Sequence, residues 1–422
     1  MRRLLSCLLL LVMVLPSPAN AAASHHAPAN PAVVSEWNAI AVSTLVADTT
    51  KAPTETPLYL GFVHAAVYNA VVGIEGRYTP YRFQARAPQR ASAQAAAVAA
   101  AHKVLVTYVP SAAGTLDTAY ATSLAQIPDG TAKRLGVAFG ELAADTLVSQ
   151  RANDGRNASV PFTRPPAPGV WRPTPPASAP FLTPWLGAVK PLMVRDGAQF
   201  GRPGPPPALT SARYARDFNE VKATGSAGST VRTAEQTAIA LFYSGNPAVQ
   251  YNLALRKQAA LRGLDIVESA RLFAAVDMSM ADTLITVWHS KYHYAFWRPI
   301  TAITLADTDG NPATTADPSW VPLVNTPPYP EYVSGYSGVT GAFSRSLGTA
   351  LDTHHLRLEL TSTAVPGAVR EYDSARALNA DVIDARVWLG FHFRSADTGG
   401  VQIGQRVADW SLDRYFRPVD HD

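Results

Sequence analysis

Cysteine is almost absent from this 422-residue chain. Its single cysteine, Cys7, lies within residues 1–21, which have the pattern of a secretory signal: Arg2 and Arg3, an apolar run, and a small-residue cleavage site that ends at Ala21. The chain that remains after cleavage has no thiol, which excludes disulfides and cysteine-containing metal sites. We expect the protein to be secreted or periplasmic.

Charge of one sign and long apolar runs are also scarce. The formal net charge is only +4, and no basic run or alternation of basic and aromatic residues suggests nucleic-acid binding. The apolar run of the signal is too short to span a membrane, and no second candidate span follows it. We therefore expect no nucleic-acid partner and no membrane span.

Many segments of the sequence are rich in alanine and have helical periodicity. Proline is also frequent. Apolar residues make up 47% of the chain, and 34 residues are proline. Few segments alternate in the manner of a strand, so we predict an all-α fold. Among the predicted helices are residues 37–47, 57–72, 91–109, 112–124, 131–152, 211–223, 233–242, 248–262 and 337–351.

Proline is concentrated in residues 165–207, where it prevents a continuous helix. We predict two helical bundles, over residues 22–164 and 208–422, joined by this proline-rich connection. The aromatic residues Trp171 and Trp185 within the connection indicate a segment that packs over the surface and is not a free linker.

Two cations extend the apolar face of a long predicted helix, which begins at a capping box formed by Asp265 and Glu268. Continued at the same spacing, this face reaches Lys291 and Arg298, and Pro299 is expected to end the helix. Buried cations need a partner, and few carboxylates lie nearby in the sequence. The two cations are either surface residues with packed apolar stems or ligands of an anion that is not part of the chain.

Two further clusters follow. A proline-rich approach ends at Ser334 and Gly335 before a predicted helix, where free backbone N–H groups favour an anion, although such a turn is often only a helix cap. Arg386 then precedes His392, which continues an apolar stripe and by itself would be a core histidine. Arginine binds tetrahedral anions through two hydrogen bonds, and a neutral imidazole can bond the central atom. The three clusters together predict a site for an oxyanion such as phosphate or vanadate.

The order and spacing of these residues resemble the three-part signature of the vanadium-dependent haloperoxidases. The same signature marks the type 2 phosphatidic acid phosphatase superfamily, which includes bacterial acid phosphatases. The resemblance lies in the C-terminal half and rests on Lys291, Arg298, Ser334, Gly335, Arg386 and His392. It implies an all-α fold of two helical bundles with one oxyanion site.

The resemblance also implies roles for these residues. His392 would be the apical ligand of vanadium, and the other five would neutralise the vanadate oxygens, while hydrogen peroxide oxidises a halide. Trp288 matches a tryptophan of chloroperoxidase-type members, and Tyr329 occupies the place of an aromatic residue that lines their halide pocket. In the phosphatase version, phosphate occupies the same site and His392 forms a phosphohistidine.

Three positions depart from the family pattern. Val333 stands where proline usually precedes Ser-Gly, and Ala385 stands where serine usually precedes the motif arginine. Tyr336 replaces the histidine that follows Ser-Gly and acts there as general acid and base. A tyrosine with a pKa of about 10 is a poor base at neutral pH, and loss of a positioned acid or base costs roughly 10²–10⁴-fold in rate. Standard turnover is therefore expected to be impaired or altered.

His289 and His293 lie four residues apart on the long predicted helix. This spacing can hold a metal ion, but Ser290 stands where the zinc-protease motif has glutamate, which favours pocket-lining or core roles. We assign His293 to the halide or substrate pocket and hypothesise that it supplies the proton transfer that Tyr336 cannot.

Three functions remain open at this point. The first is a secreted haloperoxidase-like enzyme of altered activity. It is favoured by Trp288 and by Tyr329, the aromatic residue in the proline-rich segment before Ser334. The second is a phosphomonoesterase on the same scaffold, which shares every anion contact with the first. The third, suggested by Tyr336, is an oxyanion-binding protein without turnover.

Overall fold

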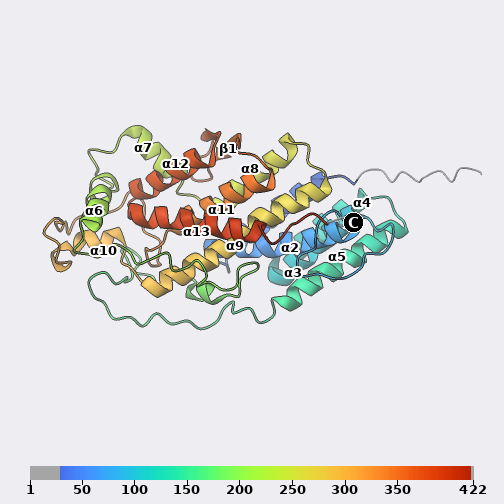
Figure 1. Ribbon diagram of the computed structural model, residues 1–422, viewed down its shortest axis with the longest axis horizontal. Coiled ribbons are helices and arrows are strands. Elements are labelled where there is room, and N and C mark those ends of the chain that lie inside the picture. Colours follow the sequence, from blue (N-terminus) through green and yellow to red (C-terminus); the bar gives the residue numbers. More distant parts are fainter. Residues whose placement is uncertain (1–28, 420–422) are drawn as a thin grey trace, which may run out of the picture.

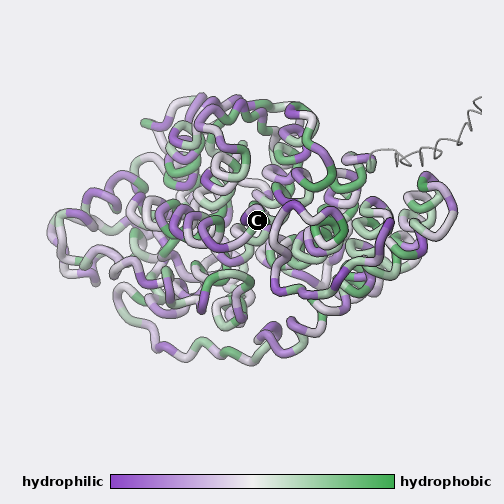
Figure 2. The backbone as a smooth tube through the Cα atoms, turned by 45° about the vertical axis from the view of Figure 1, so that its right-hand side comes forward, coloured by the Kyte–Doolittle hydropathy of each residue, from purple (hydrophilic) through white to green (hydrophobic). Residues whose placement is uncertain are grey.

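The structure is a computed structural model that describes residues 29–419, so the proposed signal over residues 1–21 lies outside the described residues. The described residues form helices and one two-stranded sheet, which confirms the all-α prediction. In Figure 2, hydrophobic and hydrophilic stretches alternate along the helices, as expected for helices that each bury one face.

The predicted helices are present, with ends that differ by a few residues. The α-helices are α1 (Ala32–Ala47), α2 (Thr56–Glu75), α3 (Ala93–Tyr108), α4 (Ala113–Ala125), α5 (Thr131–Gln150), α6 (Ala212–Thr224), α7 (Ala234–Phe242), α8 (Pro247–Leu261), α9 (Ile266–Tyr294), α10 (Pro299–Thr304), α11 (Gly335–Ala350), α12 (Ala375–Trp388) and α13 (Arg394–Leu412). Short 3₁₀ helices are η1 (Pro53–Glu55), η2 (Pro110–Ala112), η3 (Pro184–Ala188) and η4 (Ala306–Thr308). An antiparallel hairpin that the sequence did not predict pairs β1 (Leu358–Thr361) with β2 (Val369–Tyr372).

The 29-residue helix α9 is the element around which the fold is built. Its predicted capping box is confirmed: the Asp265 carboxylate accepts from the N–H of Glu268, and the Glu268 carboxylate accepts from the N–H of Asp265. Helix α2 packs against α9 from the N-terminal part of the chain, and α11 and α13 pack against it from the C-terminal part (Figure 1). One continuous hydrophobic core therefore runs through both parts.

One long apolar helix is buried within this core. The stretch Pro53–Glu75, which contains α2, is long and apolar enough to cross a membrane, but 89% of its most apolar window is buried inside the protein. Helix α3 and the segment Pro110–Ala125 pass the same test only as a pair, which is bent by 118°. The buried position of α2 is that of a core helix.

Two predicted helix ends were wrong. Helix α9 stops at Tyr294, because Ala295 adopts a left-handed conformation with φ of 50°. Arg298 instead caps α10, in which Pro299 takes the first position. Proline is suited to this position because a backbone N–H there would have no partner within the helix. Likewise, α12 ends before Gly390, whose φ is 77°, so His392 lies in a turn and not on a helical stripe.

The proline-rich connection packs over the surface, as predicted. Its residues Trp171 and Trp185 are buried. The Leu182 N–H donates to the Pro328 carbonyl at 2.8 Å, and the Leu182 carbonyl accepts from Trp288 Nε1 at 3.3 Å. The connection thus reaches the segment in which the oxyanion site was predicted, while the bundle boundaries themselves stay a prediction.

Helices α11 and α13 approach each other backbone to backbone. A Cβ atom at Gly404 in α13 would lie only 2.0 Å from the carbonyl oxygen of Gly338 in α11. This close approach holds α11 against α13, and the Ser334 N–H, at the start of α11, donates to the Ala396 carbonyl in the first turn of α13 at 3.1 Å. The packing of two glycines therefore positions part of the predicted site.

We expect the substitution Gly404→Ala to destabilise the protein by about 1–3 kcal/mol, because the added methyl group has no room between two backbones. The matched control is Gly114→Ala in α4, where a Cβ would meet nothing within 4 Å. The control should be neutral or stabilise the helix by about 0.5–1 kcal/mol. Urea unfolding of both variants measures the difference, and equal stabilities would contradict this view of the helix contact.

Candidate oxyanion site

Three buried cations converge from three separate elements. Lys291 comes from α9, Arg298 from the cap of α10 and Arg386 from α12, and their exposures are 0%, 0% and 4%. Lys291 Nζ donates to the carbonyls of Pro330 and Glu331 at 2.7 and 3.0 Å. Because these cations are fully desolvated, they are not surface residues with packed stems, and that alternative is excluded.

Backbone carbonyls hold the two guanidinium groups as well. Arg298 Nε donates to the Tyr329 carbonyl at 2.8 Å, and its Nη1 donates to the Phe391 carbonyl at 2.9 Å. Arg386 Nη1 donates to the Tyr243 carbonyl at 2.8 Å, and its Nε is buried without a partner among the described residues. Carbonyl dipoles orient the cations without removing their charge, which leaves a strongly positive interior.

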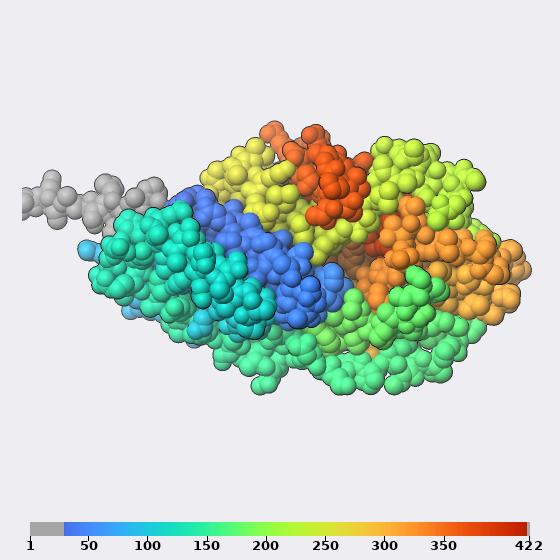
Figure 3. Space-filling model, turned by 180° about the vertical axis from the view of Figure 1, so that it is seen from behind, coloured from blue at the N-terminus to red at the C-terminus, as the bar shows by residue number. Residues whose placement is uncertain are grey.

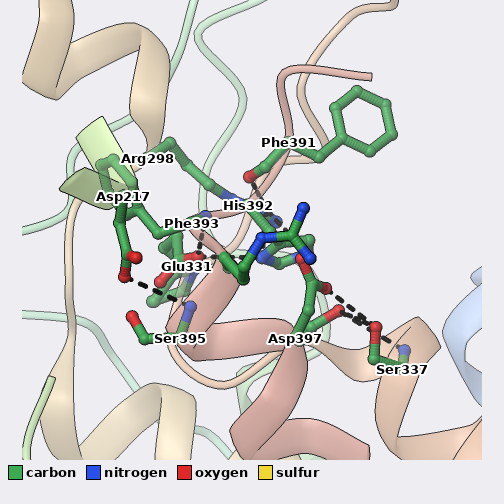
Figure 4. Close-up of polar contacts among 12 residues, drawn as sticks. Asp217, Arg298, Glu331, Ser337, Phe391, His392, Phe393, Ser395 and Asp397 are labelled. Atoms are coloured by element: carbon green, nitrogen blue, oxygen red, sulfur yellow. Dashed lines mark hydrogen bonds and ion pairs between the residues drawn. The ribbon is translucent and has the colours of Figure 1, made fainter. Parts of the chain in front are cut away.

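His392 lies against one of these cations and against a carboxylate that the sequence analysis missed. Its Nδ1 is 3.1 Å from Glu331 Oε1, which also accepts from the Phe393 N–H at 2.9 Å (Figure 4). Its Nε2 lies 3.2 Å from Arg298 Nη1. Burial and the neighbouring cations hold the pKa of His392 well below its usual range, so the ring is neutral. These contacts assign the proton to Nδ1 and the lone pair to Nε2.

Two buried carboxylates balance part of the positive charge. Burial raises the pKa of Glu331 to about 8 and that of Asp397 to about 7. One oxygen of each carboxylate, Oε2 and Oδ2, is buried without a partner among the described residues. The expectation that few carboxylates lie near the cations in sequence overlooked Glu331, which stands inside the proline-rich approach and close to Lys291 in space.

Ser334 and Gly335 open α11 as predicted. The Ser334 hydroxyl donates to Ser337 Oγ at 3.2 Å, and the Ser337 hydroxyl donates to Asp397 Oδ1 at 2.8 Å. Gly335 is the first residue of the helix, where the backbone N–H has no partner within the helix. A Cβ at Gly335 would lie 3.1 Å from the Trp288 ring, so glycine lets the indole pack directly on this turn.

Tyr336 stands at the motif position where histidine is expected, but its contacts differ from those of an acid or base. Its hydroxyl donates to Gln250 Oε1 at 3.0 Å, and the Arg386 guanidinium carbon lies 4.6 Å from the centre of its ring. Burial raises the pKa of Tyr336 far above its usual range, so the phenol stays protonated. In this arrangement the Tyr336 ring packs against Arg386, and its hydroxyl group faces Gln250.

A pocket of about 390 Å³ leads to the cluster. Trp288, Tyr329, Gly335, Tyr336 and Arg386 are among the residues that line it. Figure 3 shows the corresponding hollow between the blue N-terminal segment, the yellow-green α7–α8 turn and the orange residues before α11. Lys291, Arg298, Ser334 and His392 are buried and are not among the residues that line this pocket, so they lie behind its wall.

The assignment of His293 to this pocket was wrong. Its side chain is exposed, and its carbonyl accepts from Arg164 Nη2. The His293 ring lies nearly parallel to His289, with centroids 6.4 Å apart, and neither ring lines the pocket. Within residues 29–419 no group of three or more histidine, cysteine, aspartate or glutamate residues could hold a metal ion. The predicted proton-transfer role of His293 therefore loses its geometric basis.

The donor set fits a tetrahedral oxyanion. Three cations supply N–H donors, the unpartnered Arg386 Nε is free to bind, and the first turn of α11 adds a hydroxyl and a backbone N–H. His392 Nε2 carries a lone pair suited to a central vanadium or phosphorus atom. Glu331 and Asp397 oppose the anion only when they are ionised, and burial disfavours their ionised forms.

We expect the affinity for sulfate to rise by roughly tenfold as the pH falls from about 9 to about 6. Protonation of Glu331 and Asp397 removes negative charge in this range, while Arg298 and Arg386 stay positive. Burial lowers the pKa of Lys291, so any change in its charge acts in the same direction. Sulfate is a suitable probe because its own charge does not change, and calorimetric titration gives the affinity.

The matched variant is Glu331→Gln, which keeps an acceptor beside His392 and Phe393 but carries no charge. It should bind sulfate more tightly than the parent protein at about pH 9 and show a smaller rise on acidification. An unchanged pH profile in this variant would contradict the assigned role of the Glu331 charge.

Comparisons with known proteins agree with this site. A family model described as the VCPO second helical-bundle domain matches residues 271–421. Vanadium chloroperoxidase of Curvularia inaequalis is 30% identical over a stretch that covers 39% of this chain and 37% of that protein. The match thus spans little more than a third of that relative.

Solved structures resemble the fold over most of the chain. A bacterial vanadium-dependent iodoperoxidase has a TM-score of 0.79 and 23% identity, with 94% of this chain and 100% of that chain covered. A holo-type bacterial vanadium-dependent chloroperoxidase has a TM-score of 0.69 and 19% identity, with 88% and 95% covered. Residues 271–421 therefore match the second helical-bundle domain of the vanadium chloroperoxidases, and the chain as a whole shares the fold of the vanadium-dependent haloperoxidases.

Proposed function

We propose that the protein is a vanadate-binding haloperoxidase that oxidises halide with hydrogen peroxide. The observation that carries this proposal is the neutral His392, whose Nδ1 lies against Glu331 and whose Nε2 lies 3.2 Å from Arg298, one of the three buried cations. A bound vanadate would act as a Lewis acid toward peroxide. The signal pattern of residues 1–21 supports a place of action outside the cytoplasm.

Each residue of the site would have its own role in binding vanadate. Lys291, Arg298 and Arg386 would neutralise the oxygens of the anion, and the N–H of Gly335 would add a donor at the positive end of α11. His392 Nε2 would bond vanadium. Glu331 would hold the Nδ1 proton of His392, which fixes the tautomer and orients the ring, as a carboxylate does for metal-bound histidines.

Proton exchange near neutral pH then falls to carboxylates and not to Tyr336. Glu331 and Asp397 have pKa values of about 8 and 7, close to the value that general acid–base catalysis favours. The Ser334–Ser337–Asp397 hydrogen bonds connect the second of these carboxylates to the turn that would bind the anion. These groups give the divergent site a proton donor and acceptor that the family pattern places elsewhere.

The contact between Glu331 and His392 also favours phosphomonoester hydrolysis as a second candidate. A histidine whose Nδ1–H is held by a carboxylate is an oriented nucleophile, and its Nε2 could attack a phosphoryl group. Phosphate release that vanadate inhibits, without halide oxidation, would favour this candidate over the first.

Calorimetric titration with orthovanadate tests the proposed function. We expect the parent protein to bind vanadate and the His392→Ala variant to lose most of the affinity, because the central bond disappears while the cations remain. Sulfate binding by the same variant is the control and should persist. Iodide oxidation by the vanadate-loaded protein and peroxide is the second step. Failure of the parent protein to bind vanadate would rule out the haloperoxidase proposal.

The role of Tyr336 can be tested separately with Tyr336→Phe. This variant keeps the ring against Arg386, so activity should fall by less than about threefold, whereas loss of a general acid or base costs roughly 10²–10⁴-fold. Loss of the hydrogen bond to Gln250 should lower the free energy of unfolding by about 0.5–1.5 kcal/mol. A large loss of activity in a folded variant would return Tyr336 to a catalytic role.

A further inference from the structure

A second pocket lies in the proline-rich connection and the residues just before it. Its volume is about 400 Å³, within the range of roughly 300–1,000 Å³ that suits small organic molecules. Its lining residues all fall between Val160 and Pro184, and none of them lines the pocket in front of the oxyanion site. Figure 1 shows this stretch, which follows α5, as a long loop along the lower edge of the molecule. The two pockets are therefore separate sites.

Three aromatic rings form much of the apolar wall of this second pocket. The Trp171 ring centroid lies 5.3 Å from that of Phe162 and 5.6 Å from that of Phe181. The Tyr292 hydroxyl of α9 donates to the Pro161 carbonyl at 3.0 Å, which ties this wall to the central helix. Most of the other lining residues are prolines, whose fixed φ angles limit movement of the backbone. The walls are therefore preformed and favour a flat aromatic ligand.

The polar groups of the pocket are donors. Trp171 Nε1 and Arg172 Nε are each buried without a hydrogen-bond partner among the described residues. An indole N–H and a guanidinium group donate hydrogen bonds but accept none. Burial of a donor without an acceptor costs free energy, and the cost is greater for a charged group. These two side chains are therefore complementary to a ligand that brings an acceptor.

The charge of the lining has one sign. Arg164 and Arg172 are the only charged residues among the described residues that line the pocket. Arg164 Nη2 donates to the His293 carbonyl at 2.6 Å, so its guanidinium group is held at the edge of the connection. An uncharged aromatic molecule would leave this positive charge without a partner, and a hydrated inorganic anion would gain little from aromatic walls. An aromatic molecule with a negative charge satisfies both parts of the lining.

We propose that this pocket binds a small aromatic carboxylate, with its ring against Trp171, Phe162 and Phe181. The carboxylate would accept from Arg172 Nε and Trp171 Nε1, since hydrogen bonds between a guanidinium group and a carboxylate are among the strong ones in proteins. The Trp171 backbone N–H donates to the Ala295 carbonyl at 2.7 Å, so the ligand would lie near the turn that follows α9. This binding needs neither vanadate nor halide oxidation.

The test measures binding of 2-naphthoate to the purified protein by calorimetry at about pH 7, without vanadate, halide or peroxide. The uncharged analogue is 2-naphthamide, which keeps the ring and the carbonyl acceptor. We expect saturable binding of naphthoate that is at least about fivefold tighter than that of naphthamide, because only the carboxylate pairs with the guanidinium charge.

The Arg172→Gln variant removes the charge from the pocket and should weaken naphthoate binding by about tenfold, to the level of naphthamide. The matched control is Arg406→Gln, because Arg406 is exposed on α13 and does not line the pocket. The control should bind naphthoate as the parent protein does. Circular dichroism confirms that both variants are folded.

The oxyanion site also contains arginine, so orthovanadate in excess is added as a competitor. Unchanged naphthoate affinity in its presence would support a site in the connection, whereas competition would place the naphthoate at the oxyanion site and overturn the proposal. No binding by the parent protein, equal binding of naphthamide, or equal weakening in the two arginine variants would each overturn it as well.

Discussion

The burial of three cations beside one neutral histidine is the constraint on which the rest of this structure depends. Removal of a cation from water is costly unless hydrogen bonds and opposite charges replace the lost hydration. Here the replacement comes from the carbonyls of residues 327–331, Phe391 and Tyr243 and from two carboxylates, Glu331 and Asp397. The same compensation sets three cations against two carboxylates, whose pKa values burial raises to about 8 and about 7.

The helices serve this arrangement by fixing where the cations and the anion-binding turn meet. Helix α9 brings Lys291 and Trp288, while the contact of α11 with α13 sets Ser334 beside Asp397. Tyr336 stands where the family pattern has histidine, and its ring packs against the Arg386 guanidinium group. With tyrosine at this position, the three cations, His392 and the turn at Ser334 still lie together.

The sequence predicted the helices and the capping box at Asp265, because each depends on local spacing, and its motifs named the cations and the histidine that the structure brings together. It did not predict that Arg298 belongs to a different helix from Lys291, since the left-handed turn at Ala295 has no glycine to mark it. It also missed Glu331 and Asp397, whose importance comes from burial among distant cations. The placement of His293 in the pocket failed for the opposite reason, because helical spacing alone does not tell which face of α9 meets the site.

The shared core has a consequence for how this protein can be divided. The region that matches the family model, residues 271–421, contains all of the predicted anion-binding side chains. However, Arg386 is held by the carbonyl of Tyr243, Tyr336 by Gln250, and α9 itself is covered by α2, all of which precede that region. The predicted anion-binding residues lie together in the matched region of the sequence, but side chains, carbonyls and a helix that precede it hold them in place. Exchange of residues 271–421 between relatives would transfer the predicted anion-binding side chains without Tyr243, Gln250 and α2, which contact them or their helices.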